Sequence, residues 1–474
     1  MPAGTRQLYN LATDMRPALT ARRTRREALA LLSTCLWLLV LAACSSPPPA
    51  SPPASDAAAA TIFEGARLIT GDGSAPIEDA AFVMEGDRIT RVGRRGDVEA
   101  PEGAARVDLT GKTVMPALVD AHSHLGYTDV KRNATAAGNY TRVNLVDHLK
   151  RYAYYGIAAT LSMGVDRGDV PYEVRDMPVP GAALFRTAGR GIALPNAGPG
   201  AEYRRDAAYG VTTEAEARKA VQELAARRVD LVKIWVDDRN GTVKKLPPPM
   251  YRAIIDEAHK HNLRVAAHIF DLADAKDLLR AGIDGFAHGV RDRDIDDEFM
   301  TLIRQRPEVF VIPNLPDRGI APDAEWVSET VPVEEVTRAR EALAARTPAQ
   351  VRQQSDLFDV QARNLAKLNA AGVTIGFGTD AGVSVGWPAH TELADMVAAG
   401  MTPMQVIVAA TKTSAAILGI DELGGIAPGK SASFIVLDGN PLDDITNTRR
   451  IDRVYLRGQA VDRAALRAGW TRYP

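Results

Sequence analysis

Short apolar runs of about five to eight residues recur along the middle of the chain, and helical patterns separate them. Typical helical patterns cover residues 214–229 and 249–262. Strand and helix alternating about eight times over roughly 300 residues predict an α/β protein, a (β/α)8 TIM-type barrel over residues 116–420. The rival is an open doubly wound sheet, but the Gly-rich phosphate loop typical of that fold is not found. The predicted strands are 114–124, 157–164, 182–189, 229–236, 263–270, 283–290, 309–315 and 372–380.

The segments before and after this region of the sequence show strand patterns. Residues 82–93 alternate apolar and polar positions around Gly86–Asp87, which predicts a hairpin. Residues 431–442 and 451–461 have similar patterns. We expect segments 61–115 and 421–474 to combine into one small β-sandwich domain.

The N-terminus has the pattern of an export signal. A basic stretch at 22–27 precedes an apolar stretch at 28–43, which is shorter than the ~20 residues of a membrane-spanning helix. We assign 1–43 as a signal peptide and 44–60 as a Pro/Ala/Ser-rich tether. The "LAAC" at 41–44 resembles a bacterial lipobox. That resemblance implies lipidation of Cys44 and an anchor on the periplasmic side of the envelope, at the outer membrane because Ser45 follows. An ordinary signal peptide or an N-terminal membrane anchor is the alternative.

The charge composition limits the kinds of binding partner that are expected. Loss of residues 1–43 would leave 51 of the 57 basic and 57 of the 59 acidic residues, for a net charge of about −6. This balance does not favour nucleic acid, and a small-molecule substrate is expected. Cys35 and Cys44 are the only cysteines, so the mature chain would have no disulfide. The sequence does not indicate an oligomeric state.

Metal-ligating side chains recur near the predicted strand ends. His122 and His124 are two apart, so they share one face of the first strand. Active sites of (β/α)8 barrels lie at the carboxyl ends of the strands, so these side chains should meet there. Six polar side chains lie near the ends of the predicted strands: His122, His124, Lys233, His268, His288 and Asp380. Taken singly, each of them could be structural: a hydrogen-bonded histidine, a lysine reaching solvent or an aspartate capping a turn.

The motifs "DAHSH", "VKIW", "AAHIF", "FAHGV" and "GFGTDAG" together resemble the amidohydrolase superfamily, in its imidazolonepropionase-like and Xaa-dipeptidase (prolidase)-like branch. The resemblance covers roughly residues 61–465, with Ala117 standing where relatives usually have glycine. It implies two divalent metal ions, with zinc expected. His122, His124 and Asp380 would hold one ion and His268 and His288 the other. Lys233, carboxylated by CO2, would bridge them; a single ion beside an unmodified Lys233 is the alternative.

The resemblance also implies metal-assisted hydrolysis of an amide-type C–N bond in a dipeptide, an N-acyl amino acid or a cyclic amide. Asp380 would act as general base and then general acid. Tyr127, Arg204, Arg205 and His390 are candidate substrate contacts or supporting residues near the mouth of the barrel. A solvated loop without substrate contact is the alternative for Tyr127, Arg204 and Arg205. Two alternatives are lactone or phosphotriester hydrolysis at the same metals and a surface lipoprotein that binds a ligand without catalysis. Deamination fits less well, because deaminases of this superfamily typically lack the bridging lysine.

Overall fold

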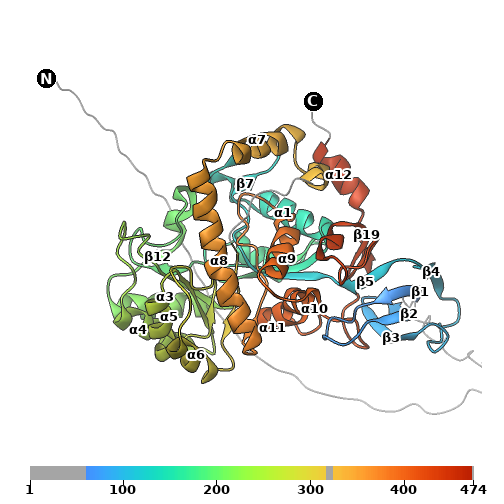
Figure 1. The fold of residues 1–474 in the computed structure, drawn as a ribbon, viewed down its shortest axis with the longest axis horizontal. Coiled ribbons are helices and arrows are strands. Elements are labelled where there is room, and N and C mark those ends of the chain that lie inside the picture. Colours follow the sequence, from blue (N-terminus) through green and yellow to red (C-terminus); the bar gives the residue numbers. More distant parts are fainter. Residues whose placement is uncertain (1–59, 316–323, 472–474) are drawn as a thin grey trace, which may run out of the picture. The chain divides into compact units, whose positions relative to one another are not determined.

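The computed structural model describes residues 60–315 and 324–471 (Figure 1). The predicted signal peptide, Cys44 and all but the last residue of the tether lie outside these ranges. Within them, no helix combines the length and the apolar character needed to cross a membrane.

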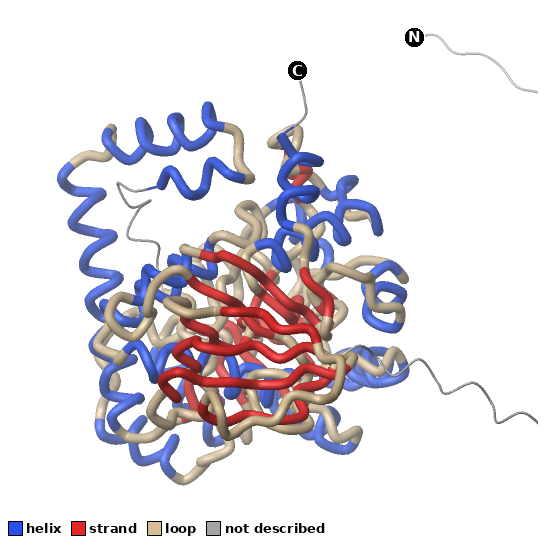
Figure 2. The backbone as a smooth tube through the Cα atoms, turned by 90° about the vertical axis from the view of Figure 1, so that its right-hand side faces the viewer, coloured by secondary structure: helices blue, strands red, loops and turns tan. Residues whose placement is uncertain are grey.

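Strands from both ends of the described chain form one sheet, which faces the viewer in Figure 2. The strand order is β20-β19-β18-β5-β1-β2-β3, with β4 also paired to β1. Antiparallel pairing of β18 with β5 joins the two ends, and the predicted hairpin is confirmed as β2–β3. The structure shows one connected sheet rather than two separate layers, so the sandwich stays a prediction. The strands are β1 (Thr61–Leu68), β2 (Ile77–Glu85), β3 (Arg88–Arg94), β4 (Ala105–Asp108), β5 (Thr113–Pro116), β18 (Phe434–Leu437), β19 (Ile451–Leu456) and β20 (Gln459–Ala460).

An aromatic cluster fills the core of this sheet. Phe63 stacks on Phe82 with ring centroids 4.8 Å apart. Phe434, from the other end of the chain, meets both rings edge-on at 5.2 and 5.1 Å. All three side chains are buried. The core therefore requires residues that are more than 350 positions apart in the sequence.

Parallel strands form the middle of the chain. One sheet has the order β10-β9-β6 and the other β12-β11-β13-β14-β15-β16-β17. Each of the eight predicted ranges contains a strand, although the last three strands have only two residues each. The strands are β6 (Leu118–Ser123), β9 (Ile157–Ser162), β10 (Leu184–Thr187), β11 (Ile192–Ala193), β12 (Tyr209–Gly210), β13 (Val232–Val236), β14 (Val265–Ile269), β15 (Gly285–Phe286), β16 (Phe310–Val311) and β17 (Thr374–Ile375), besides a separate pair, β7 (Thr128–Asp129) and β8 (Ala134–Thr135).

Hydrogen bonds link these two parallel sheets on both sides. The Asp230 N–H donates to the Thr187 carbonyl at 2.9 Å, and the Ala121 N–H donates to the Phe377 carbonyl at 2.8 Å. The second contact brings the start of the parallel region next to the segment that follows β17. Continuous pairing around a closed barrel is not assigned, so closure stays a prediction.

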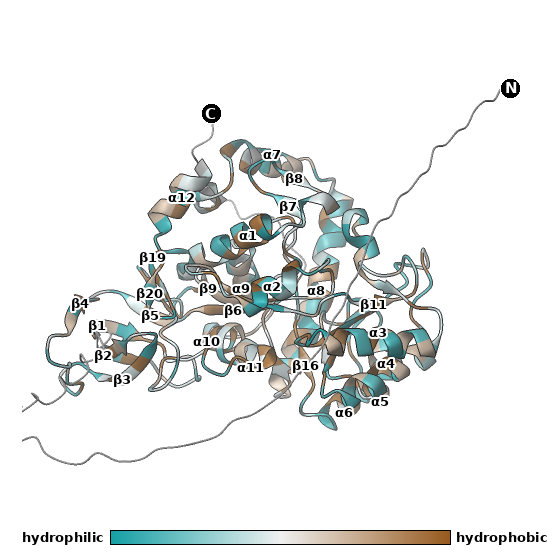
Figure 3. Cartoon of the chain, turned by 180° about the vertical axis from the view of Figure 1, so that it is seen from behind, coloured by the Kyte–Doolittle hydropathy of each residue, from teal (hydrophilic) through white to brown (hydrophobic). Residues whose placement is uncertain are grey.

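Amphipathic helices accompany the parallel strands, as Figure 3 shows by hydropathy. In α3, Thr213 caps the first turn and the apolar face from Ala217 to Leu224 is buried. The predicted helices at 214–229 and 249–262 are confirmed as α3 and α4. The helices are α1 (Arg142–Tyr154), α2 (Val170–Asp176), α3 (Glu214–Ala226), α4 (Pro248–Lys260), α5 (Leu272–Ala281), α6 (Asp297–Arg304), α7 (Val333–Ala344), α8 (Pro348–Ala370), α9 (Pro388–Ala398), α10 (Pro403–Val408), α11 (Ser414–Leu418) and α12 (Arg463–Thr471), with short helices η1 (Ala137–Asn139), η2 (Glu202–Ala207), η3 (Ala324–Glu329), η4 (Ala409–Thr413) and η5 (Ile445–Arg449).

Replacing Phe434 by alanine should test whether the two chain ends share one core. The substitution removes a buried ring that contacts Phe63 and Phe82, so we expect the free energy of unfolding to fall by about 3–5 kcal/mol. The melting temperature measures this change. The Val143→Ala control, at a side chain 81% exposed, should melt like the parent. Equal melting of both variants and the parent would contradict a core shared by the two ends.

Candidate metal centre

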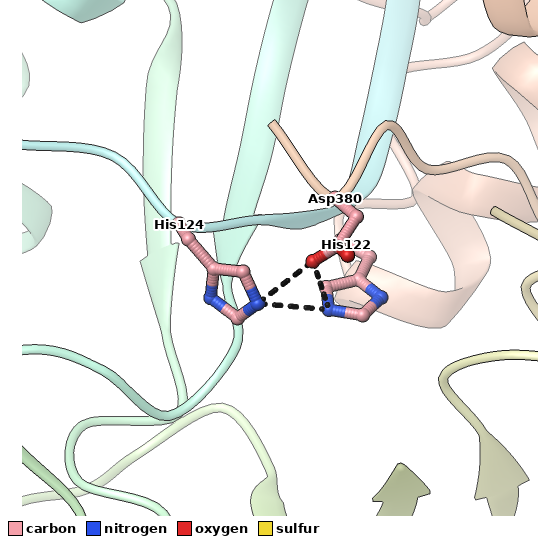
Figure 4. Close-up of side chains that lie close together, drawn as sticks. All are labelled: His122, His124 and Asp380. Carbon is pink, nitrogen blue, oxygen red and sulfur yellow. Dashed lines mark hydrogen bonds and ion pairs between the residues drawn. The ribbon is translucent and has the colours of Figure 1, made fainter. Parts of the chain in front are cut away.

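His122 and His124 bring their imidazoles together at the end of β6. Both are buried, and their Nε2 atoms lie 3.3 Å apart (Figure 4). The Nδ1 atom of His122 lies 2.9 Å from the Ala287 carbonyl and 2.8 Å from the Asn314 Oδ1 atom. Because both partners accept hydrogen bonds, Nδ1 carries the proton. The Nε2 lone pair of His122 is therefore available to a metal ion.

Asp380 completes a group of three ligand atoms. Its Oδ1 atom lies 2.9 Å from the Nε2 atom of His124 and 3.5 Å from that of His122 (Figure 4). The three atoms all lie within 4.8 Å of one another. Asp380 has φ +52°, a left-handed conformation that non-glycine residues seldom adopt outside constrained sites. Its N–H donates to the His122 carbonyl at 2.8 Å, which fixes the carboxylate beside the two rings.

Asp120 connects the two segments that carry this group. Its fully buried carboxylate accepts from the His122 N–H at 3.0 Å and from the Tyr152 hydroxyl at 2.9 Å. It also accepts from the N–H and hydroxyl of Thr379 at 3.1 and 2.7 Å. Burial raises the pKa of Asp120 to about 6, even though these hydrogen bonds favour the charged form. Asp120 lies two residues before the first histidine in the sequence, but no role was predicted for it.

Lys233 lies in β13, and its side chain is completely buried. Its Nζ atom has no hydrogen-bond partner in the described part of the chain. Burial lowers the pKa of Lys233 to about 7; the charge of Asp380 raises it, and Arg291 and Arg204 lower it. A Cβ at Gly164 would lie 2.8 Å from the Cβ of Lys233, so only glycine allows β13 this close approach. The Lys233 amine is therefore close enough to Asp380 for the carboxylate charge to affect its pKa, but it has no hydrogen-bond partner among the described residues.

The other two predicted ligands extend the cluster of rings. His268 is in β14, and its ring centroid lies 4.5 Å from that of His288, which lies 5.0 Å from that of His122. His288 comes two residues after β15 and Asp380 five residues after β17, so both follow their strands rather than ending them. The Nε2 atom of His268 is 3.0 Å from the Asp237 Oδ2 atom, a contact that leaves its Nδ1 atom for another ligand.

The protonation of these residues suits a divalent cation. Burial lowers the pKa values of His124 and His268 to about 4 and those of His122 and His288 well below the ordinary value. Neutral imidazoles with a carboxylate form a donor set typical of zinc and similar ions. Buried nitrogens of His124 and His288, both Nδ1, also lack partners among the described residues. The residues present therefore fit a metal ion, and ligation by His122, His124, Lys233, His268, His288 and Asp380 stays a prediction.

A cavity of about 290 Å³ opens beside Asp380. Arg204 is the one predicted substrate contact on its wall. A Cβ at Gly382 would lie 2.8 Å from the Arg204 Nη1 atom and 3.4 Å from the His124 Cβ atom, so the guanidinium lies close to the candidate metal ligand His124. The lining residues are Tyr203, Arg204, Leu315, Thr379, Asp380, Ala381, Gly382, Val383, Ser384, Trp387, Pro388, Thr391, Glu392 and Asp395.

The other three candidate contacts do not line this cavity. Tyr127 is fully buried, and its hydroxyl donates to the Val165 carbonyl and accepts from Arg167 at 2.9 Å. Arg205 donates to the Gly200 carbonyl at 3.1 Å. His390 is fully buried, with hydrogen bonds to Thr448 and to the Tyr155 carbonyl. Packing and internal hydrogen bonds therefore account for Tyr127 and His390 without a substrate.

Two acidic residues on the cavity wall were not among the site residues predicted from the sequence. Glu392 and Asp395 are both buried on α9, one helical turn apart. Glu392 accepts from the Leu315 N–H at 3.1 Å. Burial, followed by the charge of Asp395, raises the pKa of Glu392 well above its ordinary value. The available signal was the presence of acids three apart in an otherwise apolar helix.

Comparisons of this chain with a family profile and with related sequences point to the same family, and comparison with solved structures supports the same fold. The sequence profile of the amidohydrolase family matches residues 113–461. Ochratoxinase from Aspergillus niger is 27% identical over 431 residues, which cover 81% of this chain and 82% of that protein. Imidazolonepropionase from Streptomyces coelicolor is 25% identical over 395 residues, covering 79% and 90%. A solved Xaa-Pro dipeptidase with bound methionine, 24% identical, has the same fold with a TM-score of 0.67 over 85% of this chain and 99% of that one.

The buried neutral His390 should make the protein less stable in acid. Burial lowers the pKa of His390 from 6.5 to about 3, so below pH 6.5 the unfolded chain takes up a proton that the folded chain does not. Stability is therefore lost as the pH falls. Between pH 7.5 and 5 the His390→Gln variant should lose less stability than the parent, by on the order of 2 kcal/mol. Melting temperatures across this range measure the difference.

The matched control is His261→Gln, at a side chain 39% exposed. It should keep the pH dependence of the parent. An unchanged pH slope in His390→Gln would show that His390 is not held neutral by the fold.

Proposed function

The chain belongs to the amidohydrolase family, and we propose from this premise that it is a metal-dependent hydrolase that cleaves an amide-type C–N bond. The observation that carries the proposal is the group formed by His122, His124 and Asp380 near the buried Lys233 amine, which has no hydrogen-bond partner among the described residues. Hydrolase relatives, ochratoxinase and imidazolonepropionase, support it. The substrate would be a dipeptide, an N-acyl amino acid or a cyclic amide. We take the strands in the eight predicted ranges as a (β/α)8 barrel and the sheet from both chain ends as its sandwich domain.

The predicted ligand set has room for two divalent ions, with zinc as the expected metal. His122, His124 and Asp380 would hold one, and His268 and His288 the other. A bound divalent ion lowers the pKa of water and polarises a carbonyl group. For Lys233 to bridge, its protonated amine would first lose one proton, and the neutral Nζ atom would then form an N–C bond with CO2 and release a second proton. This step replaces a buried cation by an anion with two oxygen ligands, which suits a site already surrounded by Arg204 and Arg291.

Asp380 would move the proton during the reaction. Its carboxylate accepts the proton of the attacking water while the oxygen of that water bonds to the substrate carbonyl carbon. It then delivers the proton to the leaving nitrogen as the C–N bond breaks. Asp120 accepts hydrogen bonds from the N–H groups of both His122 and Thr379 and so holds Asp380 in place, which makes Asp120 a positioning residue.

The Lys233→Ala variant should lose metal and turnover together. Loss of outer hydrogen-bond partners of metal ligands costs about 10–100-fold, so loss of a bridging ligand should cost at least about a hundredfold in kcat/KM. Elemental analysis and a panel of dipeptides, N-acyl amino acids, cyclic amides, a lactone and a phosphotriester measure this. Propionate should partly restore both quantities, because it supplies two oxygens in the space left by the side chain. Lys219→Ala, at a side chain 75% exposed, is the control.

The outcomes separate the rival functions. Full metal content and turnover in Lys233→Ala would contradict the bridging role. Preferred turnover of the lactone or the phosphotriester would favour the alternative hydrolases. Ligand binding that resists chelation, without hydrolysis of any substrate, would favour a non-catalytic surface lipoprotein.

We also propose that the protein is exported and anchored by a lipid on Cys44, on the periplasmic side of the outer membrane. A bacterial host that makes the full chain with radioactive palmitate should label the parent but not Cys44→Ala. The unlabelled variant should move from the membrane fraction to the soluble fraction. Cys35→Ala is the control and should remain labelled. Equal labelling of the parent and Cys44→Ala would rule out this anchor.

A further inference from the structure

A second cavity adjoins the cavity beside Asp380. It has a volume of about 220 Å³. Val383, Ser384 and Trp387 line both cavities, so the two spaces are neighbours. Together the two volumes fall in the range of about 300–1,000 Å³ typical of small-molecule sites.

Apolar side chains dominate this second cavity, which we name the valine chamber. It lies between the segment after β6, the segment after β17, and η3 and α7. The residues that line it are Thr128, Val130, Asn133, Arg151, Val327, Val331, Val336, Ala339, Val383, Ser384, Val385 and Trp387.

Charged and polar groups of the valine chamber are largely engaged elsewhere. The Arg151 guanidinium binds Asp147 at 2.8 Å and the Thr330 carbonyl at 3.1 Å. The Thr128 hydroxyl donates to the Gly382 carbonyl at 2.8 Å. The surface left to an occupant is therefore mainly valine, alanine and tryptophan side chain. Such a surface favours a bulky apolar group and disfavours a charged one.

The cavity beside Asp380 differs from the valine chamber, because a charged side chain, Arg204, lines part of it. The Nε and Nη1 atoms of Arg204 are buried and have no hydrogen-bond partner within residues 60–315 and 324–471. Guanidinium groups pair strongly with carboxylates, often through two parallel hydrogen bonds. Since Arg204 lies over Gly382 and beside His124, an anion bound to it would lie next to the metal ligands.

We propose that the substrate is an N-acyl amino acid with a bulky apolar acyl group. Its carboxylate pairs with Arg204, its acyl group occupies the valine chamber, and its amide bond lies at Asp380 between them. Water adds a hydroxyl to the acyl carbon and a proton to the nitrogen, so the products are an apolar carboxylic acid and a free amino acid. This inference rests on the proposed amide hydrolysis and narrows its substrate class.

Filling the valine chamber should remove the preference for a long acyl group. Each buried methylene contributes roughly fourfold in affinity, so Ala339→Phe should raise the KM for N-octanoyl-alanine about tenfold or more. The same variant should leave N-acetyl-alanine within about twofold, because an acetyl group is too short to enter. Ala342→Phe is the matched control, since Ala342 is exposed on the same helix and lines neither cavity.

Removing the guanidinium should remove the preference for a carboxylate. Arg204→Gln should lower kcat/KM for N-octanoyl-alanine about ten- to hundredfold, the range for a charge-assisted hydrogen bond. It should have little effect on N-octanoyl-ethylamine, which lacks the carboxylate. Arg227→Gln, at a side chain 54% exposed, is the control.

A binding measurement separates this inference from the proposed function. The ketone analogue of N-octanoyl-alanine, with CH2 in place of NH, cannot be hydrolysed at that position. Calorimetry should show that it binds the parent protein and weakens at least tenfold in Ala339→Phe and in Arg204→Gln. Binding with this pattern but no amide turnover by the parent would reject the proposed reaction and keep the two subsites. Amide turnover indifferent to chain length, carboxylate and both substitutions would reject the inference and keep the reaction.

Discussion

The site depends on hydrogen bonds between β6 and the segment that follows β17. Asp120 accepts from the backbone of both segments, and the carbonyl of His122 accepts from the Asp380 N–H. These bonds join residues about 260 positions apart and bring one carboxylate to two imidazoles. An unpaired buried donor costs about 1–3 kcal/mol, so the arrangement is strongly favoured once the segments meet. The left-handed backbone of Asp380 is sustained by the same contacts.

Charge is distributed unevenly around this group. Lys233, Arg204 and Arg291 all place positive charge near the histidines, and burial keeps the imidazoles neutral. Asp380 lies near these cations, while Asp237 is engaged by His268. A centre of this kind gains stability from added anions. Carboxylation of Lys233 and an anionic substrate would both add negative charge next to these positively charged side chains.

Much of the fold could be predicted because each strand carries its own apolar run. The positions of His122, His124 and Lys233 followed from strand periodicity. The exact boundaries could not, since β15, β16 and β17 are only two residues long and their flanking residues bond to neighbouring segments instead. Tyr127 looked accessible because it follows the histidine pair, but tertiary packing buries it. Glu392, Asp395 and the valine chamber depend on contacts between distant segments, which a local pattern does not encode.

The sheet built from both ends has a consequence for how the chain folds. Phe63 and Phe82 emerge early during synthesis, and their partner Phe434 emerges only near the end. Contacts with such large sequence separation form slowly, because a long loop must close before they are gained. The early strands therefore keep an incomplete apolar face until synthesis is nearly over. A ribosome-bound chain therefore exposes that face until its last strands are made, and loss of the last forty or so residues would expose it permanently.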